Sequence, residues 1–215
     1  GNGNDLPFSV SAWVKLDDTN KQRILSKDLS TSSREYLFGT NGANRFNMIF
    51  GTGSKNLDIG STTPLNTTDW FHVVATYDGS KNASGLKLYV NGDDSNRVDS
   101  SVGSYTGMTE TTGALEIGRF ANGHSDFDGK LDEIAIFNSE LSASDVSSLA
   151  ASRGAHIVND LSLSPVAYYR MGEDDSLTDG ASASQITDAS GNGHHSTQST
   201  AANQPTASVD PVIYV

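Results

Sequence analysis

The chain has 215 residues, no cysteine and a formal net charge of −12. Without cysteine it can form neither disulfides nor a thiolate metal site, and its negative charge disfavours nucleic acid as a partner. No apolar run approaches the roughly 18 residues that a membrane span needs, so we expect no membrane insertion. The acidity is typical of a solvated surface, and it also suits oxygen clusters that hold Ca²⁺.

Alternation of apolar and polar residues begins with the stretch FSVSAWVKL. It places Phe8, Val10 and Val14 on one face and Trp13 on the other, which predicts a half-buried antiparallel strand. Short strands separated by Gly, Asn and Ser are then predicted at 23–27, 35–40, 45–53 and 56–61.

The next stretch, 69–80, reads DWFHVVATYDGS and is apolar on both faces, as expected for a central strand that is covered on both sides. A strand within 85–94 ends at the turn signal Asn91-Gly92, and two more strands are predicted within 113–120 and 129–137. One helix is predicted within 141–154, with Ser142 as N-cap, Asp145 completing a capping box and Gly154 at the end.

Many short strands joined by turns, with a single short helix, predict an all-β protein. The fold class that we expect is an antiparallel β-sandwich of the jelly-roll type.

Several of these stretches carry a family resemblance. FSVSAWVKL, DWFHVVATYDGS, LKLYVNGD, LEIGRF and FDGKLDEIAIFNSELSASDVSSL follow one another in the order that is typical of laminin-G-like domains. The resemblance runs from Phe8 to about Gly154, and it implies a concanavalin A-like fold of the lectin/glucanase superfamily.

The opening strand and loop of such domains resemble AYYRMGE and TDASGNGHHST, which lie here at 167–173 and 187–197, near the wrong end of the chain. Either a tandem array ends just inside a second repeat, or residues 1–215 form one sandwich in which 156–215 supply the opening strands. We favour the second explanation, because a leftover half-domain would expose apolar strands. The recipient sheet is the chain's own or a neighbour's.

Catalysis is not expected. Glucanases of this superfamily carry closely spaced carboxylates that flank one glycosidic bond. The nearest candidates here, Asp132 and Glu133, are adjacent on a predicted strand and should therefore point to opposite faces.

A structural Ca²⁺ ion is one interpretation of the acidic residues. Asp132 shares strand parity with Ile134 and Ile136, so it should face the core, where a carboxylate needs backbone donors, a cation or a metal. The resemblance places this strand close to the Gly-rich loop, where Asp188, Asn192 and backbone carbonyls could provide oxygen ligands. Backbone N–H donors remain the alternative to a metal.

Candidate sugar-binding residues gather in the loop at 118–129, since sugar sites combine aromatic faces with polar loop residues. The candidates there are Phe120, Asn122, His124, Asp126 and Asp128. Trp13 is a further candidate for stacking, with packing in a second minor core as the alternative.

The function predicted first is a non-catalytic surface module for assembly or adhesion, in particular a structural or decoration protein of a phage virion. The alternative is a secreted bacterial carbohydrate-binding module of a polysaccharide-degrading system. Neighbouring protein subunits, glycans or both are the expected partners, and the expected location is extracellular or on a virion surface.

Overall fold

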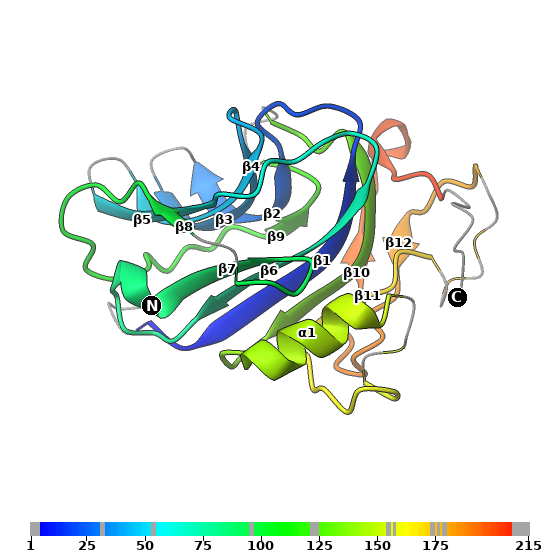
Figure 1. Ribbon diagram of the computed structural model, residues 1–215. Coiled ribbons are helices and arrows are strands. Elements are labelled where there is room, and N and C mark those ends of the chain that lie inside the picture. Colours follow the sequence, from blue (N-terminus) through cyan, green and yellow to red (C-terminus); the bar gives the residue numbers. More distant parts are fainter. Residues whose placement is uncertain are drawn as a thin grey trace.

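The protein folds as two antiparallel sheets packed face to face (Figure 1). The computed structural model describes residues 5–30, 33–52, 55–94, 97–120, 125–153, 156, 158–172, 175, 177 and 180–207. The strand order is β11-β10-β1-β6-β7 in one sheet and β8-β5-β4-β3-β2-β9 in the other. The predicted all-β sandwich with one short helix is confirmed.

The bounds of the elements follow. The first six strands are β1 (Phe8–Leu16), β2 (Arg23–Ser30), β3 (Ser33–Asn41), β4 (Arg45–Thr52), β5 (Lys55–Ser61) and β6 (Trp70–Tyr77). After the short 3-10 helix η1 (Ala83–Gly85) come β7 (Leu86–Val90), β8 (Arg97–Asp99), β9 (Leu115–Ile117) and β10 (Gly129–Phe137). The helix α1 (Ala143–Ala151) precedes β11 (Ala167–Tyr169), β12 (Gln185–Ile186), β13 (Ser196–Thr197) and the 3-10 helix η3 (Ala201–Asn203).

The main core lies between the sheets and follows the predicted alternation. Val10 and Val14 of β1 are fully buried, and from the other sheet they are met by residues such as Phe38 and Met48. Burial of each such side chain stabilises the fold by about 1.5–3 kcal/mol.

A second, smaller core lies on the opposite face of the five-stranded sheet, where α1 covers it (Figure 1). Val146 and Leu149 of the helix pack against Val74 of β6 and Phe137 of β10. Burial of β6 on both faces was predicted and is confirmed. The capping box of α1 is also confirmed, since the backbone N–H of Asp145 donates to the Ser142 hydroxyl and the Asp145 carboxylate accepts from the backbone N–H of Ser142.

Strand β10 contains a bulge that the sequence pattern does not reveal. Trp13 pairs with Asp132 and Ser11 pairs with Ala135, so two residues of β10 lie opposite a single residue of β1. Glu133 adopts a φ of +48°, in the left-handed region. The prediction that Asp132 faces the core with Ile134 is therefore wrong, because the bulge places it beside Trp13 on the face that α1 covers.

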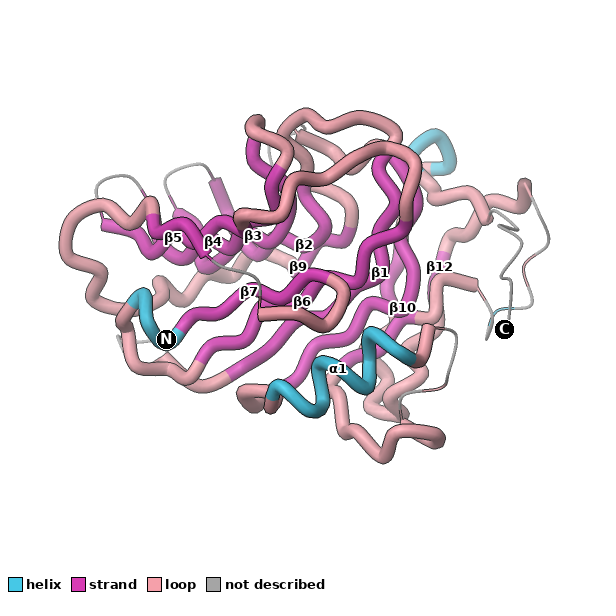
Figure 2. The backbone as a smooth tube through the Cα atoms, viewed as in Figure 1, coloured by secondary structure: helices cyan, strands magenta, loops and turns pink. Residues whose placement is uncertain are grey.

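The segment after α1 returns to the five-stranded sheet of its own chain in this structure. β11 pairs antiparallel with β10, with Ile134 opposite Tyr169 and Ile136 opposite Ala167. Farther along, Ala183 and Ile186 are buried in the main core. Figure 2 shows that this C-terminal part is mostly loop, although β12 and β13 pair with each other. Whether the same strands exchange between molecules in solution stays a prediction.

Asp188 fastens the loop after β12 to β11. Its carboxylate accepts hydrogen bonds from the backbone N–H groups of Tyr168 (2.9 Å), Ser190 (3.0 Å) and His194 (2.9 Å), and its side chain is buried. Burial alone would raise the pKa of Asp188, but the hydrogen bonds from Ser190, Tyr168 and His194 outweigh it and lower that pKa below its usual value.

Among the described residues, no helix has both the length and the apolar character that a membrane crossing requires.

We predict that a chain ending at Arg153 does not fold stably. Without β11 the edge of β10 would be unpaired. Without Ala183 and Ile186, the part of the main core that they cover would be exposed to solvent. Thermal unfolding followed by circular dichroism should show no sharp transition, or the protein should aggregate. A monomer that unfolds cooperatively would contradict this and would favour a truncated tandem array.

We also predict that Asp188→Asn lowers the free energy of unfolding at pH 7 by about 1–3 kcal/mol, because the amide cannot accept all three N–H donors. Since folding depresses the pKa of Asp188, this contribution is present above the unfolded pKa of about 3.9 and is lost as the pH falls through the folded value. Urea unfolding at pH 7 and pH 3 measures the difference. An equal effect from Asp93→Asn, at an exposed carboxylate, would refute the assignment.

Candidate functional site

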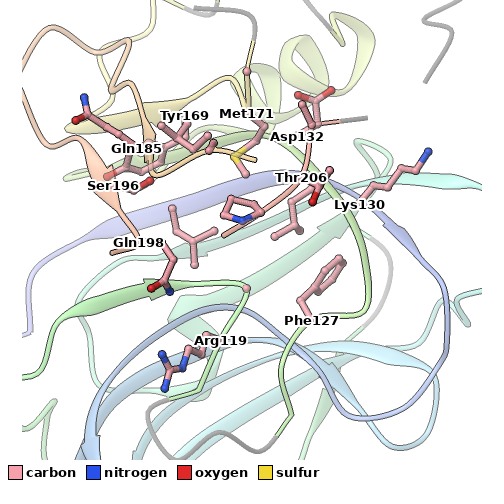
Figure 3. Close-up of a pocket in the computed structure, with 18 of the residues that line it drawn as sticks. Arg119, Phe127, Lys130, Asp132, Tyr169, Met171, Gln185, Ser196, Gln198 and Thr206 are labelled. Carbon is pink, nitrogen blue, oxygen red and sulfur yellow. The ribbon is translucent and has the colours of Figure 1, made fainter. Parts of the chain in front are cut away.

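A cleft of about 1000 Å³ opens at one side of the sandwich. It is bounded by β9 at the edge of the six-stranded sheet, by β10 and β11 of the five-stranded sheet, and by the C-terminal segment (Figure 3). Among the described strands, β9 pairs with neither β10 nor β11 on this side. The C-terminal segment therefore forms a third wall instead of closing the gap.

A glycine, Gly129, lies in the lining of the cleft where β10 begins. Gly129 begins β10 with a φ of +142°, and a Cβ atom there would clash with the backbone carbonyl of Lys15. The glycine lets β10 approach β1 closely at the point where the chain leaves the loop at 118–128. The side chains that follow on β10, Lys130 to Asp132, line the cleft.

The lining of the cleft combines several kinds of side chain. The sheet edges and the loop before β10 contribute apolar and aromatic residues and also charged ones: Leu115, Ile117, Phe127, Leu131, Tyr169 and Met171, with Glu116, Arg119, Lys130 and Asp132. The C-terminal segment contributes amide and hydroxyl groups and also apolar residues: Gln185, Ser196, Thr197, Gln198, Asn203 and Thr206, with Leu177, Ala183, Ile186, Pro205 and Ala207. Figure 3 shows members of both sets around the same space. Such a combination suits a ligand that has both apolar faces and hydroxyl groups.

A cation lies between aromatic rings at one end of the cleft. The guanidinium carbon of Arg153 is 3.9 Å from the ring centroid of Trp70 and 5.4 Å from that of Trp13. The Arg153 Nε atom is 3.8 Å from Oδ2 of Asp132. Trp70, Asp132 and Arg153 line the cleft, so ligand binding there would change the surroundings of a tryptophan.

The two carboxylates of β10 are engaged separately. Asp132 Oδ1 accepts from the backbone N–H of Glu133 at 2.9 Å. Glu133 is 5% exposed, accepts a hydrogen bond from the Tyr168 hydroxyl and lies 3.4 Å from Arg170 Nε. The bulge, rather than regular alternation, determines where they point. A carboxylate buried in this way cannot act on one glycosidic bond together with Asp132.

A buried histidine also lacks the features of a catalytic base. His72 Nε2 is 2.9 Å from the Ser11 hydroxyl, but within the described part of the chain His72 Nδ1 has no hydrogen-bond partner. Complete burial lowers the pKa of His72 to about 3, so the imidazole is neutral at physiological pH. No carboxylate orients the ring, as a catalytic triad requires.

Each predicted calcium ligand contacts other groups of the protein. Both oxygens of Asp188 accept backbone N–H groups, which is the alternative that the sequence left open. The Asn192 side-chain amide donates to the carbonyl of Val166 at 3.1 Å, while Asp132 lies beside Arg153. Across the described residues, no group of three or more His, Asp or Glu side chains is arranged to hold a metal. Calcium binding stays an untested prediction.

The predicted sugar-binding residues are dispersed. Phe120 is buried against Leu37 and Ile49 on the outer face of the six-stranded sheet, where it offers little surface for stacking. Asp126 and Asp128 are exposed, and Asn122 and His124 lie outside the described residues. Phe120, Asp126 and Asp128 are not among the residues that line the cleft, although Phe127 is.

Trp13 packs beside His72, with ring centroids 5.2 Å apart, and beside Arg153. It lies on the side of β1 away from the main core, as the alternation predicts, but outside the cleft lining. The residues that sequence reasoning missed, such as Gln185, Gln198 and Thr206, carry no local motif. Only the return of the C-terminal segment to the sandwich brings them to the cleft.

Comparisons with known proteins agree with this architecture. A family model described as the concanavalin A-like lectin/glucanases superfamily matches residues 2–147. A comparison with curated proteins finds no match.

Among solved structures, a protein from Bacteroides ovatus described as a candidate carbohydrate-binding protein superposes with a TM-score of 0.62 at 20% identity. The match covers 90% of this chain and 52% of that chain, so this chain spans about half of that protein's length. The CBM40 module of the Ruminococcus gnavus IT-sialidase, in complex with α2,3-sialyllactose, has a TM-score of 0.54 at 14% identity and covers 69% of this chain and 85% of that chain.

At these identities the structural likenesses establish the fold alone. The family model covers about two thirds of the sequence, and the two packed antiparallel sheets are those of a β-sandwich. The chain belongs to the concanavalin A-like lectin/glucanase superfamily.

Proposed function

We propose that the chain is a non-catalytic carbohydrate-binding module of an extracellular system, and that the cleft beside β9, β10 and β11 is its binding site. The observation that carries this proposal is a cleft lining that combines apolar and aromatic residues with amides and hydroxyls. A sugar ring presents C–H faces that pack on apolar side chains and a perimeter of hydroxyls that needs hydrogen-bond partners.

The comparisons support carbohydrate binding rather than the role that sequence analysis placed first. The B. ovatus protein is described as a candidate carbohydrate-binding protein, and the CBM40 module is in complex with a sialylated sugar. A role in virion structure or decoration gains no support from these relatives. Assembly with neighbouring subunits and adhesion remain separate predictions.

The absence of catalysis in this proposal rests on the positions of the acidic groups. Glu133 is buried beneath α1 and binds Tyr168, whereas Asp132 lies beside Arg153 at one end of the cleft. Among the described residues, Asp132 and Glu116 of β9 are the carboxylate residues in the cleft lining, and we propose that the cleft holds a glycan without cleaving it.

We predict that the protein binds at least one glycan on an array and that the double variant Gln185→Ala/Thr206→Ala weakens binding about tenfold, because two hydrogen-bonding side chains of the cleft are removed. Titration calorimetry with the best array ligand gives the dissociation constants, and tryptophan emission should change on binding because Trp70 lines the cleft.

The matched control is Thr106→Ala/Thr109→Ala, at exposed threonine positions outside the cleft lining, and it should bind as the unmodified protein does. Absence of binding to every glycan would refute the proposed function. Binding that the Gln185/Thr206 variant leaves unchanged would move the site away from the cleft.

A further inference from the structure

The outer face of the six-stranded sheet, which points away from the main core, carries a group of polar residues. Phe38 and Met48 fill the core, so their neighbours Leu37 and Asn47 point to the other side of the sheet. Arg23 pairs with Gly39 and lies on this outer side as well. We call Arg23, Arg34, Asn47 and Asp58 the outer-face cluster; they come from β2, β3, β4 and β5 in turn.

Arg23 is the most unusual member of the cluster. It is only 2% exposed, and its Nη1 donates to the backbone carbonyls of Gln22 (3.3 Å) and Thr40 (3.2 Å). Among the described residues no carboxylate lies within ion-pair distance of Arg23, and its Nε has no acceptor. Buried charges in proteins are normally paired, so an anionic partner is expected for the Arg23 guanidinium.

Arg34 offers a second unpaired donor. Its Nε is buried without an acceptor in the described part of the chain, and its guanidinium carbon is 5.9 Å from the Phe120 ring centroid. Asn47 donates to Asp58 at 3.3 Å, but the Asn47 Oδ1 atom is buried and accepts nothing there. The cluster thus has two free guanidinium donors and one free amide acceptor.

The charges around the cluster favour an anion. Burial lowers the pKa of Arg23 to about 10, and repulsion from Arg34 contributes to that shift. Burial also lowers the pKa of Lys21 and raises the pKa of Asp58, although cations surround that carboxyl. Lys21, Arg23 and Arg34 repel one another here, and they interact with the carboxylates Asp28 and Asp58. This local excess of positive charge stands in a chain whose net charge is −12.

We propose that the outer-face cluster binds a carboxylate or another oxyanion through the guanidinium groups of Arg23 and Arg34. Arginine suits this role because its N–H groups match the oxygens of such anions and stay charged at physiological pH. A hydroxyl on the same ligand could donate to Asn47 Oδ1, which would favour a sugar acid over an inorganic anion. This site is distinct from the cleft and does not rest on the proposed function.

The test measures melting temperature against increasing sodium glucuronate, sodium sulfate or glucose, with ionic strength held constant by NaCl. Binding to the folded state should raise the melting temperature along a saturating curve. We expect saturation with glucuronate but not with glucose. A similar response to sulfate would identify the ligand as an oxyanion in general, and none with sulfate would identify a sugar acid.

The variants Arg34→Gln and Arg23→Met should weaken the glucuronate response about tenfold or more, since each removes a charge-assisted hydrogen bond. Lys55→Gln removes the same charge from an exposed position on β5 and should keep the response. Arg23→Met should also fold, since it replaces a buried, unpaired charge by an apolar chain of similar length. If the Arg23→Met variant does not fold, the Arg34→Gln variant still tests the proposal.

Two results would overturn the proposal: no saturable effect of either anion on the unmodified protein, or an equal effect on Arg34→Gln. The Gln185→Ala/Thr206→Ala variant should keep the anion response. A negative glycan array with a positive anion response would therefore refute carbohydrate binding in the cleft and leave this site standing.

Discussion

Strand β11 pairs with β10 over only three residues, yet the edge of the core, the cleft and the environment of Asp188 all depend on this pairing. It brings Tyr168 beneath α1 and Tyr169 into the main core. The loop that carries Asp188 is then fixed to the same strand by the hydrogen bond from the Tyr168 backbone N–H to the buried carboxylate. Because the segment beyond β11 crosses the open side of the sandwich, it supplies amide and hydroxyl groups to the lining of the cleft.

The bulge in β10 determines which acidic groups can meet a ligand. An extra residue at Glu133 turns Asp132 toward Trp13 and Arg153 and buries Glu133 against Tyr168. One carboxylate is thereby left at the end of the cleft, beside a cation that packs on Trp70. Among the described residues, Asp132 and Glu116 of β9 are the two carboxylate residues in the cleft lining, and in the proposed binding module they would accept hydrogen bonds from the hydroxyls of a bound glycan.

Local patterns in the sequence predict much of the fold and little of the site. The alternation of 8–16 and the capping box at Ser142 depend on near neighbours, so the strand and the helix were predicted correctly. The bulge at Glu133 could not be read from LDEIAIF, because a regular strand fits that pattern equally well. The cleft combines β9, β10 and residues of the last third of the chain, and no motif marks Gln198 or Thr206. Phe120, predicted as a sugar-binding residue, lies in a buried apolar cluster rather than on an open surface.

The central claim is that each chain completes its own sandwich and so builds its own cleft. Since the chain has no cysteine, the pair Ile136→Cys/Ala167→Cys, at facing positions of β10 and β11, provides a direct measurement. Facing Cα atoms of antiparallel strands lie about 4.5–5.5 Å apart, within the range that a disulfide spans. After mild oxidation of dilute protein, electrophoresis without reductant should show a cross-linked monomer. Covalent dimers or larger species under the same conditions would mean that the strands exchange between molecules, and would contradict the account.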